Sequence, residues 1–325
     1  MTSFHDLLCC PSCRGALSIS PQSLDCPTCD TRYPVVDDIP ILIRGMTPEN
    51  LESRFTRYWD STAKADLYDR KVEGGDDPFG VYNHESELYG ITALCRTENL
   101  DLVLDAGCGN GRFMAGLGPE SLAVGCDASL NLLRIARAKG RGAFHVCCEL
   151  EHLPFRNDAF GSVISCRVLQ HLVEQERAVS EMARVVRPKG DLILQVYNTW
   201  NLKTIYKNIR MSPIRKVFNW PFRKLFRSMS PFDDWGLDYD RYNSWVELSR
   251  WMSRSGLQRL SGRGVGFGYH KYFFQPFYID AVLRNHAPNF LKGYYRFCAA
   301  LERRIGSLPP FRYLLEKIAI RGSKP

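Results

Sequence analysis

Short apolar runs alternate with segments of helical periodicity between residues 102 and 197. Apolar runs occupy residues 102–105, 122–127 and 191–197, and each has the length of a buried strand. Between them, residues 129–139 and 174–186 place apolar side chains at helical spacing. A helix between two strands returns the chain to the same edge of a sheet, so the strands pair in parallel. The pattern predicts an α/β fold with a doubly wound, mostly parallel sheet covered by helices on both faces.

Three alternating glycines follow the first of these runs. Gly107, Gly109 and Gly111 come directly after a strand that ends near Asp105, and such a turn lets a ligand lie against bare backbone at the start of a helix. A dinucleotide site needs glycine at positions 1, 3 and 6, but Arg112 stands at position 6 here. Asp105 would repel a pyrophosphate, whereas it suits a ligand with a sulfonium and an ammonium group. The turn therefore favours S-adenosylmethionine as the cofactor.

Four further motifs follow in the order found in one enzyme family. They are the run 122–127, which ends in Asp127, Glu-Leu-Glu-His-Leu-Pro-Phe at 149–155, Ile-Ser-Cys-Arg-Val-Leu-Gln-His at 164–171, and Arg-Val-Val-Arg-Pro-Lys-Gly at 184–190. With the glycine turn, they resemble the class I S-adenosylmethionine-dependent methyltransferases. The resemblance implies a Rossmann-like sheet of seven strands, with a turn before the fifth at residues 184–190. It also implies that Asp127 accepts both ribose hydroxyls, since a carboxylate can bind a diol in a bidentate manner.

The same resemblance implies roles for single residues near the strand ends. Glu149 would face the adenine amino group, at a position where aspartate is commoner in the family. His171 follows the fourth strand and is the candidate base for a hydroxyl acceptor, although a structural histidine is the alternative. Strand ends converge on one crevice of such a sheet. The cofactor-binding residues implied are Asp105, Gly107, Cys108, Gly109, Gly111, Asp127, Ala128, Glu149, Leu150 and Cys166.

Five of the twelve cysteines lie within the first thirty residues. Two identical C-P-x-C knuckles are separated by twelve residues, a spacing at which four thiolates can close a tetrahedral zinc site. The expected ligands are Cys10, Cys13, Cys26 and Cys29, whereas Cys9 has no counterpart in the second knuckle. Free or redox-active cysteines are the alternative. Residues 7–43 resemble a zinc-ribbon domain that elsewhere is a separate activating partner of RNA and protein methyltransferases. Because four cysteines leave no open coordination position, we expect a structural zinc.

The chain divides into five expected units. They are a zinc ribbon at 1–44, a helical connector and cofactor lid at 45–100, the cofactor-binding core at 101–198, a basic aromatic cap at 199–243, and the end of the core sheet with a second insertion at 244–325. The resemblance implies that Tyr58 or Trp59 belongs to the lid, and the alternative is that these aromatics only dock their helix on the sheet. In the last unit we expect a helix at 244–256, strands at 256–260 and 317–321, and a flexible substrate loop at the glycine-rich residues 262–268.

The expected cap is strongly basic. Residues 200–230 contain eight Lys or Arg and no Asp or Glu, which equals the whole net charge of +8. Aromatic residues accompany these cations. A basic aromatic segment is compatible with an anionic membrane and a lipid-borne substrate, with RNA phosphates and stacked bases, or with a substrate lid whose basic face is solvated.

We therefore expect a methyltransferase that uses S-adenosylmethionine and modifies an O or N nucleophile of a small-molecule, glycan or lipid-linked acceptor. Two alternatives stay open. One is an RNA methyltransferase that holds nucleic acid with the zinc ribbon and the basic cap, and the other is a noncatalytic adaptor that binds the cofactor. The sequence contains no apolar run of 18 residues and no signal-peptide pattern at its start. We expect a cytoplasmic protein, and contact with the inner face of a membrane if the acceptor is lipid-linked.

Overall fold

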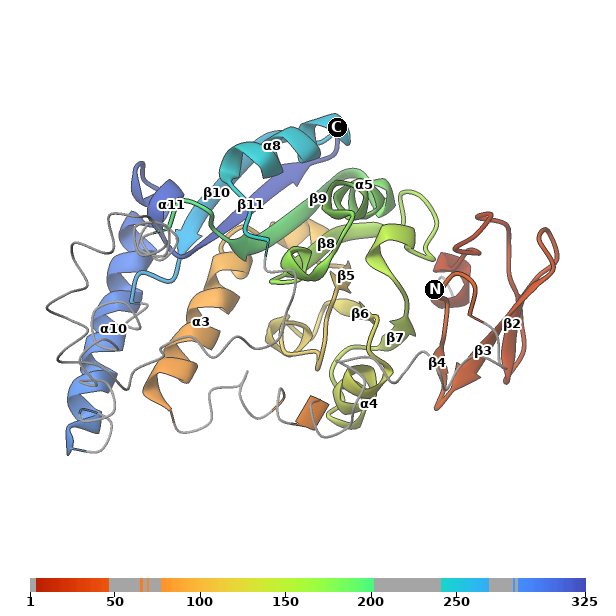
Figure 1. Ribbon diagram of the computed structural model, residues 1–325, viewed down its shortest axis with the longest axis horizontal. Helices are drawn as coiled ribbons and strands as arrows, with labels where there is room; N and C mark the ends of the chain where they lie inside the picture. The colour runs from red at the N-terminus through yellow and green to blue at the C-terminus, as the bar shows by residue number, and fades with distance from the viewer. Residues whose placement is uncertain are drawn as a thin grey trace, which may run out of the picture.

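The computed structural model describes residues 4–46, 65, 66, 69, 77–201, 241–268, 283 and 286–325. Within these ranges the chain forms a small antiparallel sheet near its N-terminus and a larger mixed sheet that carries helices on both faces (Figure 1). The expected lid residues Tyr58 and Trp59, and residues 202–230 of the expected basic cap, lie outside the described residues.

The larger sheet has seven strands in the described ranges. They are β5 (Leu102–Ala106), β6 (Leu122–Asp127), β7 (Phe144–Cys147), β8 (Phe160–Cys166), β9 (Val186–Tyr197), β10 (Gln258–Val265) and β11 (Lys317–Ser323). Their order is β10-β11-β9-β8-β5-β6-β7. Strands β5 to β9 pair in parallel, and β11 runs antiparallel to β9 and β10. The predicted seven-stranded, mostly parallel sheet is confirmed. The strand order reverses at β5, where ligands bind in such sheets.

Helices cover both faces of this sheet. The helices are α3 (Pro78–Thr92), α4 (Leu130–Ala138), α5 (Gln175–Val185), α8 (Trp245–Arg254), α10 (Pro288–Ile305) and α11 (Phe311–Leu314). Short 3-10 helices are η1 (Phe4–Leu7), η3 (Thr97–Asn99), η4 (Met114–Gly116), η5 (Leu150–His152) and η6 (Leu169–His171). Helices α5 and α8 pack on the face that presents Leu104 and Leu194, whereas α3 packs on the face that presents Val103 and Ile193. Helix α10 packs on α3 and lies at the left of Figure 1.

The helix starts follow their sequence signals. The Ser129 hydroxyl accepts a hydrogen bond from the Leu132 amide at the start of α4. At the start of α8, Ser244 and Glu247 form a reciprocal capping box, which satisfies amides that the helix itself leaves unpaired. Gly256 then adopts a φ of +84° just after α8, a conformation that favours glycine.

Three local features differ from what the sequence predicts. Only the three-residue η4 follows the glycine turn, because Gly116 and Gly118 in front of Pro119 oppose a longer helix. Residues 187–190 form a bulge inside β9 rather than a turn before it. Residues 262–265 of the loop expected at 262–268 belong instead to strand β10. A Cβ on Gly262 would lie only 2.3 Å from the Ala319 carbonyl oxygen. The glycines there permit close packing of strands.

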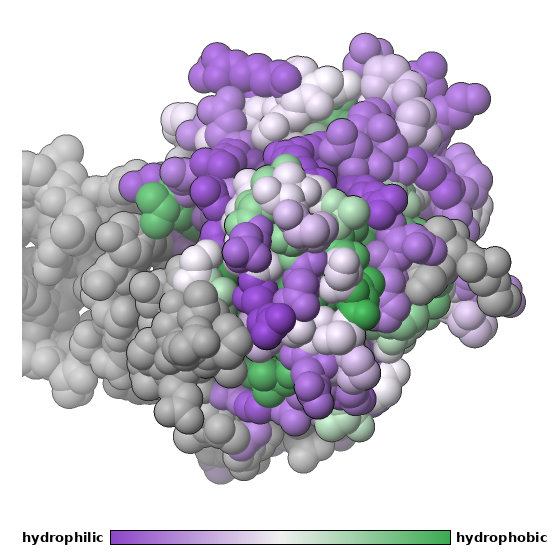
Figure 2. Space-filling view, turned by 90° about the vertical axis from the view of Figure 1, so that its right-hand side faces the viewer, coloured by the Kyte–Doolittle hydropathy of each residue, from purple (hydrophilic) through white to green (hydrophobic). Residues whose placement is uncertain are grey.

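The N-terminal sheet contains β1 (Ser18–Ile19), β2 (Ser23–Cys26), β3 (Thr31–Val36) and β4 (Ile39–Pro40) in sequential order. It forms the right-hand end of the molecule in Figure 1, and Figure 2 looks directly at this end. Hydrophilic residues predominate among the coloured atoms of that view. We call this unit the N-terminal domain. Residues 4–46 hold five aspartates and three arginines, so the side chains of the domain carry a net negative charge before any metal is counted.

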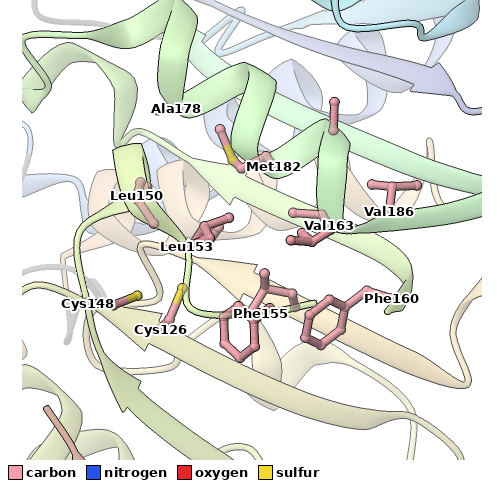
Figure 3. Close-up of a cluster of buried hydrophobic side chains, with 14 of the residues drawn as sticks. Cys126, Cys148, Leu150, Leu153, Phe155, Phe160, Val163, Ala178, Met182 and Val186 are labelled. Carbon is pink, nitrogen blue, oxygen red and sulfur yellow. The ribbon is translucent and has the colours of Figure 1, made fainter. Parts of the chain in front are cut away.

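The N-terminal domain is joined to the edge of the large sheet. Ile41 forms a parallel bridge with Cys147 at the end of β7, and Leu8 forms an antiparallel bridge with Phe155. Leu8 and Tyr33 belong to the same buried cluster as Phe155. Figure 3 shows the part of this cluster in which Leu150, Leu153 and Phe155 point inward from the loop after β7. The two sheets therefore share one hydrophobic core.

No helix in the described ranges is both long enough and apolar enough to span a bilayer.

Candidate cofactor site and metal centre

The glycine turn after β5 has the geometry of a ligand cradle. Gly107, Gly109 and Gly111 adopt φ values of +81°, +53° and +75°. The turn is held by the end of β6, since one Asp127 oxygen accepts the Gly109 amide at 2.8 Å and the other accepts the Ser129 amide at 2.8 Å. These bonds fix Asp127 beside the bare backbone of the turn.

Asp105 is the second buried acid at this edge of the sheet. Its residue is 1% exposed, and neither carboxylate oxygen has a hydrogen-bond partner among the described residues. Burial raises the pKa of Asp105, Arg112 lowers it and the nearby Asp127 raises it, and together they bring it to about 7. Burial also raises the pKa of Asp127, although its backbone hydrogen bonds offset part of the effect. A buried carboxylate without partners suits a cationic ligand.

The loop after β7 brings Glu149 and Leu150 to the same sheet edge. Glu149 precedes η5, and Leu150 is buried. Arg184 of α5 holds the loop from behind, because its guanidinium donates to the carbonyl oxygens of Leu153 at 3.0 Å and Phe155 at 2.7 Å. The N-terminal domain holds the opposite side through the bridge to Phe155. The position of Glu149 therefore depends on two separate supports.

The four knuckle cysteines come together at one end of the N-terminal domain. The Sγ atoms of Cys10, Cys13, Cys26 and Cys29 all lie within 4.8 Å of one another. Cys10 and Cys29 are 3.6 Å apart, and Cys13 and Cys26 are 3.4 Å apart. A tetrahedral zinc with bonds of about 2.3 Å places its sulfurs about 3.8 Å apart, so the cluster fits that ion. Cys9 lies outside the cluster, and its amide donates to the Pro154 carbonyl.

Comparison with known proteins supports both the cofactor site and the four-cysteine metal site. Residues 104–194 match a family model described as a methyltransferase domain, and residues 2–38 match one described as Trm112p-like protein. Residues 104–194 contain the glycine turn and the strands around it. The chain carries a class I S-adenosylmethionine-dependent methyltransferase domain. A Trm112-like four-cysteine domain, consistent with a structural zinc site, precedes it.

Individual relatives resemble about a third of this chain. The tRNA (carboxymethyluridine(34)-5-O)-methyltransferase of Arabidopsis thaliana is 37% identical over 99 residues, which are 30% of this chain and 24% of that protein. The probable tRNA methyltransferase 9B of Homo sapiens is 37% identical over 99 residues, or 30% of this chain and 21% of that protein. The matches thus span about a quarter or less of these relatives.

A solved structure shares the fold over a longer stretch. It is a Thermotoga maritima methyltransferase described as a possible histamine N-methyltransferase, with 18% identity and a TM-score of 0.50 over 81% of this chain and 97% of that chain. At this identity the likeness concerns the fold alone.

The remaining predicted residues of the methyltransferase domain lie around the same edge. Ala128 follows Asp127, and Cys108 is buried within the glycine turn. Cys166 ends β8, and burial raises the pKa of its thiol to about 12. His171 ends η6 and is exposed, with its Nε2 atom 3.2 Å from the Gln170 amide nitrogen. The structure therefore brings the acids and glycines together and leaves His171 in contact with solvent.

An ionic cluster beside the site was not predicted from the sequence. The buried Glu87 carboxylate of α3 lies 2.5 Å from Arg112, 3.2 Å from Arg167 and 2.8 Å from Lys317. Burial raises the pKa of Glu87, but the three cations outweigh burial and lower it strongly. The cluster connects α3, the glycine turn, the end of β8 and β11. Arg112 directly after the glycines was the one available signal, because nothing in the local pattern distinguishes Glu87 from its neighbour Glu85.

Replacement of Gly107 by alanine should weaken cofactor binding. An added Cβ would lie 2.3 Å from Val168 Cγ2, and the φ of +81° strains any L side chain. We expect a loss of cofactor affinity of at least tenfold, together with a stability loss of about 1–3 kcal/mol. Isothermal titration with S-adenosylmethionine measures the first effect and denaturant unfolding the second. Gly118→Ala is the matched control, because a Cβ there meets no atom within 4 Å. Equal affinity in both variants would contradict the assigned cradle.

Proposed function

We propose that this chain transfers the methyl group of S-adenosylmethionine to RNA, with tRNA as the substrate class. The observation that carries the proposal is the identity of 37% over 99 residues to proteins named as tRNA methyltransferases. This proposal adopts the RNA alternative from the sequence in place of the small-molecule, glycan or lipid-linked acceptor. The basic segment that motivated a lipid-linked substrate lies largely outside the described residues.

The proposed cofactor contacts follow from the charges at the sheet edge. Asp127 would accept the ribose hydroxyls, Asp105 would pair with the ammonium group, and Glu149 and Leu150 would contact adenine. S-adenosylmethionine supplies a methyl group that its sulfonium already activates. The protein therefore needs chiefly to orient the acceptor and to exclude water. Cys166, at the end of β8, would line the methyl side without acting as a thiolate, since its pKa lies at about 12.

His171 is the proposed base for a hydroxyl acceptor. It lies on the loop after β8, and its side chain is exposed, so an incoming substrate can reach it. A carboxylate acceptor would need no base because it carries no proton at neutral pH. The effect of His171→Ala on transfer therefore reports the chemistry of the acceptor atom.

The N-terminal domain is proposed to support the cofactor site rather than to hold RNA. Its five aspartates and three arginines give residues 4–46 a charge of −2, and zinc-bound thiolates would not make it basic. Phosphate binding requires cations. The domain instead contacts the loop that carries Glu149, through the bridge between Leu8 and Phe155. This proposal differs from the sequence hypothesis that the zinc ribbon helps to hold nucleic acid.

The proposal is tested by incubating the full chain with radiolabelled S-adenosylmethionine and separate tRNA, lipid, protein and small-molecule fractions. We expect label in tRNA that ribonuclease releases. His171→Ala, assayed beside it, should lower transfer about 100-fold for a hydroxyl acceptor without changing cofactor affinity.

Label confined to a lipid or small-molecule fraction would overturn the RNA proposal. Label in no fraction, with the cofactor still bound in isothermal titration, would favour the noncatalytic adaptor. A tRNA label that persists after His171→Ala would end the candidacy of His171 and leave the RNA proposal intact.

A further inference from the structure

Helix α10 presents an outward face whose residues are exposed. Its inward residues Leu291, Tyr295, Cys298 and Glu302 are buried, and Tyr295 stacks on Tyr82 of α3 with ring centroids 5.2 Å apart. In Figure 1 this helix lies at the end of the molecule opposite the N-terminal domain.

The rotation of α10 about its axis is fixed by a buried carboxylate. Glu302 accepts hydrogen bonds from the Tyr82 hydroxyl at 2.9 Å and the Ser86 hydroxyl at 2.7 Å. It also accepts the amides of Gly266 at 2.9 Å and Phe267 at 3.0 Å. The outward residues cannot turn inward without breaking these bonds, so their exposure is built into the fold.

Two phenylalanines are exposed on this outward face. Phe290 is 61% exposed and Phe297 is 63% exposed. Their separation of seven residues places them on one side of the helix, about 10.5 Å apart along its axis. A soluble fold usually buries side chains of this size, and exposed aromatics beside polar residues commonly mark a binding surface.

The cations of α10 lie along the other flank of the same face. The helix contains Lys292, Arg296, Arg303 and Arg304, and its one acid is the buried Glu302. At 100° per residue, Lys292, Arg296 and Arg303 lie on one flank, and Arg304 lies nearer the phenylalanines. Gly293 and Ala300 lie between the flanks and are exposed, so no large side chain separates them.

We infer that the outward face of α10 binds a single-stranded segment of the RNA substrate. The basic flank would contact the phosphates, the small residues would leave room for the sugars, and the phenylalanines would stack on unpaired bases. An anionic membrane would also attract the cations, but it would need a broad apolar face. The apolar face of α10 is already packed on α3. This inference rests on the proposed RNA substrate. It places RNA binding on α10 and not on the acidic N-terminal domain.

Two variants of the full chain test the inference against total tRNA. Lys292→Ala with Arg296→Ala should raise the tRNA dissociation constant at least fivefold and reduce the salt slope by roughly 1.4, the value for two lost phosphate contacts on a single strand. Phe290→Ser with Phe297→Ser should raise it about tenfold with little change in slope. Cofactor affinity and thermal stability should stay unchanged, since these side chains are exposed.

Arg241→Ala with Arg250→Ala is the charge-matched control. These arginines are exposed at or just before α8, which packs on the opposite face of the sheet, and we expect less than a twofold change. Wild-type tRNA affinity in both α10 variants, or an equal loss in the control, would overturn the inference. It would also be overturned if phosphatidylglycerol vesicles bound the wild type and not the α10 variants while tRNA affinity stayed constant.

The two proposals fail in different ways. If the wild type binds tRNA through α10 but labels no RNA, the proposed acceptor is wrong and the binding face stands. If the wild type labels tRNA and the α10 variants keep its KM and salt slope, the acceptor stands and the binding face is wrong.

Discussion

Replacing Cys10 by serine should unfold the N-terminal domain and destabilise the methyltransferase domain with it. Structural zinc contributes on the order of 10 kcal/mol to the folding of small metal-binding domains, and Cys10 is a buried member of the four-cysteine cluster. We expect the unfolding midpoint to fall by roughly 10 °C or more, because a loss of several kcal/mol shifts a protein of this size by that amount. Differential scanning calorimetry and metal analysis of the purified variant measure both effects.

The destabilisation should reach the cofactor site because the two sheets share one core. Leu8, Leu24 and Tyr33 lie in the same buried cluster as Leu150 and Phe155. Unfolding the N-terminal domain would expose this side of the loop after β7 and remove the bridge to Phe155. We therefore expect weaker binding of S-adenosylmethionine in the Cys10→Ser variant, although no cysteine of the cluster belongs to the proposed cofactor site.

Cys9→Ala is the matched control for this prediction. Cys9 is also buried, but it lies outside the metal cluster. Its truncation should cost about 1 kcal/mol and leave one zinc per chain. A Cys10→Ser variant that keeps the wild-type zinc content and unfolding midpoint would contradict the structural role of the metal, as would equal effects of the two substitutions.

The parts of this fold that the sequence predicts correctly are those with a local pattern. Strand β6 coincides with the apolar run 122–127, and α4 lies within the predicted helical run 129–139. The four cysteines are found together because their spacing alone restricts the metal site. In each case a few neighbouring residues contain the whole physical cause.

The parts that the sequence did not predict depend on contacts between distant segments. Glu87 meets Lys317 across 230 residues, and only the packing of α3 on the sheet brings them together. The glycines at 262–265 looked like a loop because glycine is common in turns, whereas here they allow β10 to pack against its neighbours. A glycine pattern cannot distinguish flexibility from close approach without the partner strand.

The charges counted along the sequence also predicted only part of the charged surface. The whole-chain value of +8 and the basic segment 200–230 suggested where an anionic partner would bind. They did not reveal that residues 4–46 are acidic as a unit, or that α10 exposes Lys292 and Arg296 on its outward face. The second fact depends on the hydrogen bonds of Glu302, which fix the orientation of the helix.

Asp105→Asn should weaken cofactor binding and stabilise the cofactor-free protein. The wild-type carboxylate is buried and has no hydrogen-bond partner among the described residues, so its charge opposes folding. In the complex we propose that it pairs with the ammonium group. Loss of that pair should cost about 2–3 kcal/mol, or roughly 30- to 150-fold in affinity. Substitution of a residue with only a structural role would not weaken cofactor binding and at the same time stabilise the cofactor-free protein.

The pH dependence of stability follows from the same group. Burial raises the pKa of Asp105 from 3.8 to about 7, so the folded state binds the proton more tightly than the unfolded state. The protonated Asp105 carboxyl therefore stabilises the folded state fully below pH 3.8, and this stabilisation is lost as the pH rises to about 7. The stability advantage of Asp105→Asn over the wild type should therefore widen by roughly 2–3 kcal/mol between pH 5 and pH 8. Urea unfolding of both proteins at the two pH values measures it.

Cofactor affinity should have the opposite dependence on pH. The wild type should bind S-adenosylmethionine more tightly at pH 8 than at pH 6, because the carboxylate that attracts the cation forms above about pH 7. Asp105→Asn should lack this rise. Asp101→Asn is the control, since Asp101 lies just before β5 in an exposed pair with Arg187, and its loss should cost less than about 1 kcal/mol. If Asp105→Asn instead lowers stability at pH 8 and leaves affinity unchanged, the carboxylate supports the fold and not the ligand.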